Sequence, residues 1–109
     1  VHWYSTGPFD IGGTCAVALS IAVRQVLHVA DPVEALVEAV GMGGDTDTNA
    51  AIAGALLGAV HGADAWPGQW VSGVLECEPE KGQPGVVNPL GREFWATDLL
   101  GQADRLADV

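Results

Sequence analysis

Basic residues are scarce in this sequence, and their scarcity argues against one class of partner. Four lysines and arginines stand against 14 aspartates and glutamates in 109 residues, which gives a formal net charge of −10 at pH 7. Because an acidic chain repels the phosphates of nucleic acids, we expect no direct contact with nucleic acid. Solubility alone explains most of this acidity, so the charge by itself does not require a bound metal.

The sequence also has few cysteines and no long apolar run. Cys15 and Cys77 are the only cysteines, and neither belongs to a C-x-x-C or Cys/His cluster. Zinc binding therefore has no support, and we expect both thiols to be reduced. No apolar run reaches the ~20 residues that a membrane-spanning helix needs, and no signal-peptide pattern opens the chain. We expect no membrane contact and a cytoplasmic location.

Several common catalytic motifs are missing as well. Ser5, Ser20 and Ser72 lack the sequence context of a nucleophile elbow. The chain has neither a G-x-G-x-x-G run after a strand nor a P-loop lysine motif. The sequence thus gives no support to a serine-hydrolase site or to the common nucleotide-binding loops.

Composition and periodicity predict an all-α fold. Apolar residues make up 49% of the sequence and charged residues 17%, which is typical of a globular protein. The longer periodic segments have helical spacing, and none shows sustained strand alternation. We predict a single all-helical segment over residues 1–109, arranged as an orthogonal multi-helix array. Its parts are a loop over 1–13, helices over 14–29, 32–41 and 47–61, a short helix from Pro67, an exposed loop over 76–89 and a C-terminal helix over 90–107.

Three of these helices carry further local signals. Asp31, Pro32 and Glu34 form a helix start, with a capping aspartate, a proline at the first position and a glutamate three residues after the cap. Gly54 and Gly58 lie inside the 47–61 helix, where glycine costs about 1 kcal/mol relative to alanine. We therefore predict that a neighbouring helix approaches them closely. The 14–29 helix is apolar around most of its circumference, which predicts burial on more than one side.

The stretch from Gly41 to Asn49 joins the second and third helices and is the candidate site. Its glycines allow a sharp turn and a close approach to a bound species. Asp45 and Asp47 lie two residues apart and Thr48 follows, so three oxygen-bearing side chains can converge at one helix N-terminus. Hard divalent cations such as Mg2+ and Mn2+ prefer oxygen ligands of this kind.

Local pattern leaves a simpler interpretation open. Asp45, Thr46 or Asp47 can act only as an N-cap that accepts hydrogen bonds from the first free backbone N–H groups. An EF-hand loop is excluded, because Ala50 stands at the position that needs glycine and Leu56 at the position that needs glutamate.

The loop and the helix after it resemble the C-terminal signature of the ADP-ribosylglycohydrolase family. The resemblance rests on Gly43-Gly44-Asp45-Thr46-Asp47-Thr48 and on the small-residue helix over 50–62, and it extends to the segments 31–40 and 65–71. It covers residues 12–72 and implies that the chain is the C-terminal part of an ADP-ribosylglycohydrolase-like fold.

The resemblance also implies a function and a site. The function is metal-dependent hydrolysis of an ADP-ribosyl glycosidic bond on a modified protein side chain or a small molecule. Asp45, Asp47 and Thr48 are the implied ligands of two Mg2+ or Mn2+ ions, with Thr46 facing elsewhere. The first glycine-aspartate loop and the Thr-Asp-Asp run of the family do not occur in this sequence. The missing N-terminal part of the domain is expected to supply the other ligands and the general base, so we assign no catalytic residue here and expect the isolated chain to be inactive.

Three alternatives stay open at this point. The chain can be a catalytically inactive relative or fragment that acts as a binding or structural helical module, because a fold can outlast its chemistry. It can hydrolyse another substrate through the same metals. It can also be a regulatory fragment that binds the missing half.

Overall fold

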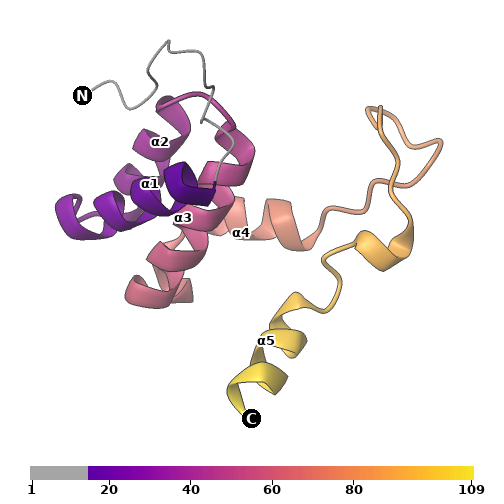
Figure 1. The fold of residues 1–109 in the computed structure, drawn as a ribbon. Helices are drawn as coiled ribbons and strands as arrows, with labels where there is room; N and C mark the ends of the chain where they lie inside the picture. The colour runs from indigo at the N-terminus through magenta and orange to yellow at the C-terminus, as the bar shows by residue number, and fades with distance from the viewer. Residues whose placement is uncertain (1–14) are drawn as a thin grey trace. The chain divides into compact units, whose positions relative to one another are not determined.

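The computed structural model describes residues 15–109, which contain five α-helices and no strand (Figure 1). The all-α prediction is confirmed. The predicted loop over 1–13 and the first residue of the predicted 14–29 helix lie outside the described residues. None of the helices within 15–109 is long and apolar enough to cross a membrane.

The α-helices are α1 (Cys15–His28), α2 (Pro32–Gly41), α3 (Thr46–His61), α4 (Gly68–Leu75) and α5 (Leu99–Ala107), with short 3-10 helices η1 (Ala63–Ala65) and η2 (Arg92–Phe94).

The chain divides into two compact units. The first ends at Trp66 and contains α1, α2, α3 and η1, and the second, Pro67–Val109, contains α4, η2 and α5. The loop between α2 and α3 belongs to the first unit. Packing among α1, α2 and α3 therefore determines where the side chains of this loop lie.

The start of α2 follows from its capping residue. One carboxylate oxygen of Asp31 accepts hydrogen bonds from the backbone N–H groups of Val33 at 2.8 Å and Glu34 at 3.0 Å. Pro32 occupies the first helical position, where its missing N–H is not needed. The predicted start signal is confirmed.

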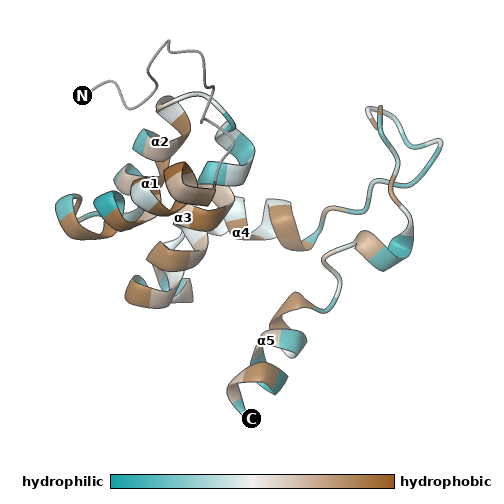
Figure 2. Cartoon of the chain, viewed as in Figure 1, coloured by the Kyte–Doolittle hydropathy of each residue, from teal (hydrophilic) through white to brown (hydrophobic). Residues whose placement is uncertain are grey.

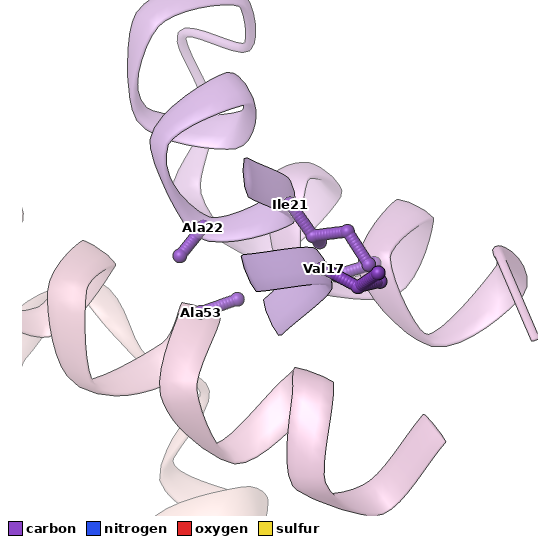
Figure 3. Close-up of a cluster of buried hydrophobic side chains, with 5 residues drawn as sticks. Val17, Ile21, Ala22 and Ala53 are labelled. Atoms are coloured by element: carbon purple, nitrogen blue, oxygen red, sulfur yellow. The ribbon is translucent and has the colours of Figure 1, made fainter. Parts of the chain in front are cut away.

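The core of the first unit is made mostly of small side chains. Ala22 of α1 and Ala53 of α3 are fully buried and point toward one another, and Val17 and Ile21 of α1 lie together on the same cluster (Figure 3). Small residues at a helix contact let the two backbones approach closely. Leu57 of α3 is the largest fully buried side chain among the described residues.

The two glycines inside α3 face different neighbours. A β-carbon placed on Gly54 would lie 3.7 Å from a methyl of Leu36 in α2, so the predicted approach of a helix is confirmed there. A β-carbon on Gly58 would lie 3.4 Å from the indole nitrogen of Trp66. At Gly58 the neighbour is thus the half-buried ring that follows η1, and the prediction of a helix at that point is wrong.

Burial of α1 on more than one side is not found within the described residues. Leu19 and Leu27 are 59% and 70% exposed, whereas Val17 and Ile21 are buried. The buried residues lie on one face of α1, and the helices that contact it in this unit are α2 and α3. The prediction is therefore wrong for the described part of the chain, because α2 and α3 cover a single face of α1.

The C-terminal helix is shorter than predicted. A helix was expected over 90–107, but α5 begins at Leu99, and the preceding residues form η2 and turns. Other partners engage the backbone of Leu90: its N–H donates to the Pro79 carbonyl at 2.9 Å, and its carbonyl accepts from the Trp95 indole at 3.0 Å. These bonds replace the helical pattern at this point, and the predicted start of the helix is wrong.

Candidate functional site

The loop between α2 and α3 reverses the chain within four residues. The backbone N–H of Met42 donates to the Glu38 carbonyl at 3.1 Å and closes the end of α2. Gly43 and Gly44 then adopt φ values of +76° and +71°, and no other residue type among those described has positive φ. This left-handed backbone costs little for glycine and is unfavourable for residues with a β-carbon. The two glycines thus turn the chain and start α3 beside the end of α2.

Asp45 occupies the N-cap position of α3 without using its side chain as a cap. Its backbone carbonyl accepts from the Asn49 N–H at 3.0 Å, but its carboxylate accepts no capping hydrogen bond. The simpler interpretation is therefore wrong for the Asp45 side chain, whereas the Asp47 carboxylate does accept a hydrogen bond from a backbone N–H of the first turn, that of Thr48. The Thr46 hydroxyl donates to the Gly44 carbonyl at 3.4 Å and is engaged within the loop.

Asp47 and Thr48 lie exposed in the first turn of α3, and Asp45 is half-buried beside them. Figure 2 shows this turn as hydrophilic and the following turns of α3 as largely hydrophobic. The Thr48 N–H donates to the Asp47 carboxylate at 3.0 Å. The loop therefore presents two carboxylates and one hydroxyl on the outside of a helix whose later turns are packed.

The pKa of Asp47 lies below its ordinary value. A hydrogen bond with the Asp45 side chain lowers it most, followed by the hydrogen bonds from the backbone N–H groups of Thr48 and Asp47 itself, while desolvation acts in the opposite direction. Asp47 is therefore ionised at neutral pH. Two ionised carboxylates in one helical turn repel each other.

The donor set fits a hard divalent cation as part of a larger site. Carboxylate and hydroxyl oxygens are the ligands that Mg2+ and Mn2+ prefer, and a dication would remove the repulsion between Asp45 and Asp47. Within residues 15–109, no group of three or more histidine, cysteine, aspartate or glutamate side chains is placed to hold a metal ion. The loop thus offers some of the oxygen ligands of a cation and leaves room for others.

Two polar side chains in this unit are buried, and neither burial was predicted. Gln25 of α1 is 0% exposed and Asn49 of α3 is 1% exposed. A signal is present for Gln25, because a polar residue in a largely apolar helix indicates a buried hydrogen-bonding partner. Cys15 and Cys77 are free thiols, and both are exposed.

Replacing Gly43 by alanine is expected to destabilise the first unit by about 1–2 kcal/mol, because a β-carbon is strained in a left-handed backbone. A β-carbon at this position meets no atom within 4 Å, so the loss comes from the backbone angle and not from crowding. Denaturant unfolding of the 109-residue chain, followed by circular dichroism, measures the change.

The matched control is Gly41→Ala. A β-carbon on Gly41 also meets nothing within 4 Å, but Gly41 is the last residue of α2 and does not have positive φ. Its replacement is expected to be neutral or slightly stabilising. Equal losses at Gly41 and Gly43 would show that the left-handed turn is not what requires glycine.

Comparison with known proteins gives two matches. The sequence model of the family described as ADP-ribosylglycohydrolase matches residues 2–108. A protein of Acanthamoeba polyphaga mimivirus that is named as an ADP-ribosyl glycohydrolase is 38% identical over 66 residues, which cover 61% of this chain and 20% of the viral protein. The chain therefore matches about a fifth of the length of that relative. No solved structure matches the chain.

Proposed function

We propose that this chain, which belongs to the ADP-ribosylglycohydrolase family, supplies part of a divalent-cation site in an enzyme that hydrolyses an ADP-ribosyl glycosidic bond. Family membership supports the reaction class, and family members are generally metal-dependent. The observation that carries the proposal is the placement of Asp45 and Asp47 in one turn at the start of α3, where Asp47 is exposed and the Asp45 carboxylate is not used to cap the helix.

Asp45, Asp47 and Thr48 are the residues that would hold Mg2+ or Mn2+. The two carboxylates supply negative charge and the Thr48 hydroxyl supplies a neutral oxygen, a mixture that suits a hard cation. Two such ions in the complete site would orient the ADP-ribose and either activate water or stabilise charge that develops at the anomeric carbon. The other ligands would come from residues outside the described part of the chain.

Asp45 and Asp47 act in this proposal as ligands and not as the general base. The lowered pKa of Asp47 keeps its carboxylate ionised and available for coordination at neutral pH. A carboxylate engaged with a dication is a poor proton acceptor. Because glycosidic hydrolysis commonly needs a carboxylate near the scissile bond, we assign the base to an acidic residue elsewhere in the natural protein. The substrate is an ADP-ribosylated protein side chain or small molecule.

The natural protein that carries this chain is expected to release free ADP-ribose from an ADP-ribosylated protein in the presence of Mg2+ or Mn2+. Substrates with an N-glycosidic and an O-glycosidic link are incubated separately, and the released ADP-ribose is quantified by liquid chromatography. Chelation of the metal should stop release, and added metal should restore it. Release that continues at the same rate after full chelation would contradict the proposed role of the loop.

A further inference from the structure

A polar network crosses the contact between α1 and α2. Its centre is Gln25, whose side chain is fully buried. The amide nitrogen of Gln25 donates to the backbone carbonyl of Ala35 at 2.7 Å and to the carboxylate of Glu38 at 3.1 Å. The amide oxygen of Gln25 accepts from the Arg24 guanidinium. The network therefore uses both donors and the acceptor of one buried amide.

This network specifies how α2 sits on α1. Arg24 and Glu38 also pair at 3.6 Å with both side chains partly exposed, so Glu38 is held by two groups of α1. The other contacts between the helices involve alanines and aliphatic side chains, which tolerate sliding and rotation. A buried amide that loses its hydrogen-bonding partners costs free energy. Arrangements of α1 and α2 that break the hydrogen bonds of Gln25 are therefore disfavoured, and one arrangement is selected.

The arrangement of α2 is passed on to the loop. The side chain of Glu38 accepts a hydrogen bond from Gln25, and the backbone carbonyl of Glu38 accepts one from the Met42 N–H at 3.1 Å. Met42 directly precedes the two left-handed glycines, and Asp45 follows them. α2 also places Leu36 against Gly54 of α3. A shift of α2 would therefore change where the chain enters the turn relative to the first turn of α3.

We propose that Gln25 is a positioning residue that holds α2, and through α2 the Gly43–Gly44 turn, so that the Asp45 and Asp47 carboxylates lie at the separation that a divalent cation requires. This inference rests on the proposed function, because it assigns Gln25 a role at the same site. Gln25 touches neither carboxylate and acts through Glu38 and the backbone. Arg24 and Glu38 support the same arrangement from the edge of the contact.

The test is a calorimetric titration of the natural protein with Mn2+, in the Gln25→Met variant and the wild type. Methionine fills a similar volume and removes all the hydrogen bonds of the amide. We expect the dissociation constant to rise about tenfold, within the range for residues that are coupled to a site without touching its ligands. Glu38→Ala removes one partner of Gln25 at a partly exposed position that tolerates truncation, and it should raise the Mn2+ dissociation constant about threefold. If Gln25→Met does not fold, the affinity of Glu38→Ala tests the positioning role instead.

The matched control is Ile21→Val, which lies one turn earlier on α1 and loosens the core without touching the network. It should lower the melting temperature and leave the Mn2+ dissociation constant unchanged. Unchanged affinity in both Gln25→Met and Glu38→Ala, or an equal loss in Ile21→Val, would overturn the positioning role while leaving the proposed function intact. A wild-type protein that binds no Mn2+ would overturn the proposed function and the positioning role with it.

Discussion

Replacing Asp47 by asparagine is expected to weaken Mg2+ and Mn2+ binding by at least about 100-fold in the natural protein. Asparagine keeps the size of the side chain but removes the negative charge, and loss of even an outer partner of a metal ligand costs up to that much. Asp47 is exposed and ionised at neutral pH, so the substitution removes a charge that is available for coordination. Turnover at fixed metal concentration should fall in parallel.

Raised metal concentration distinguishes a ligand from a proton acceptor. If Asp47 acts as a ligand, high Mg2+ should restore part of the turnover of Asp47→Asn, because occupancy recovers by mass action. Loss of a general base should resist such rescue. Full metal occupancy in Asp47→Asn with no turnover at any metal concentration would require Asp47 to be reassigned as the acid or base.

Asp64 and Thr46 provide controls for this variant. Asp64 is an exposed aspartate in η1, so Asp64→Asn changes the net charge by the same amount away from the loop. Thr46→Ala removes a hydroxyl that donates to the Gly44 carbonyl, whereas Thr48→Ala removes a proposed ligand. We expect Asp64→Asn and Thr46→Ala to bind Mg2+ nearly as the wild type does and Thr48→Ala to bind it more weakly.

Replacing Leu57 by alanine is expected to lower the free energy of unfolding of the first unit by about 3 kcal/mol, within the range of about 2–5 kcal/mol for buried leucines. Leu57 is 0% exposed, and most of the other buried hydrophobic residues among those described are alanines. Few large side chains are available to fill the space that it leaves. Because a whole domain is stabilised by only about 5–15 kcal/mol, this change should be conspicuous in denaturant unfolding of the 109-residue chain.

Leu27→Ala makes the same chemical change at a position in the same unit that is 70% exposed. It should alter the free energy of unfolding by no more than about 0.5 kcal/mol. A loss at Leu57 as small as that at Leu27 would mean that the α1–α3 core contributes little to the stability of the unit.

The parts of the structure that local signals specify could be predicted from the sequence. Asp31 and Pro32 determine the start of α2 through hydrogen bonds and a missing N–H that lie within three residues of each other. The turn at Gly43 and Gly44 follows in the same way from the backbone freedom of glycine. The Asp-x-Asp-Thr spacing likewise predicts that the candidate ligands lie in one helical turn, and they do lie at the start of α3.

Features that depend on residues far apart in the sequence could not be predicted in this way. The network of Gln25 joins residues ten and thirteen positions apart on different helices, so no local spacing indicates its partners. The late start of α5 depends on bonds from Leu90 to Pro79 and Trp95. The capping interpretation of Asp45 was wrong for a similar reason, because the orientation of a carboxylate at a helix start depends on its neighbours as well as its position.

Calorimetric titration of the natural protein with Mg2+ and Mn2+ decides whether Asp45 and Asp47 hold a divalent cation. The wild type, Asp45→Asn, Asp47→Asn and the control Asp64→Asn are titrated under the same conditions, with folding of each confirmed by circular dichroism. We expect saturable binding to the wild type and to Asp64→Asn, and a severe loss of affinity in the two loop variants. Unchanged affinity in both loop variants would show that these carboxylates do not hold the cation.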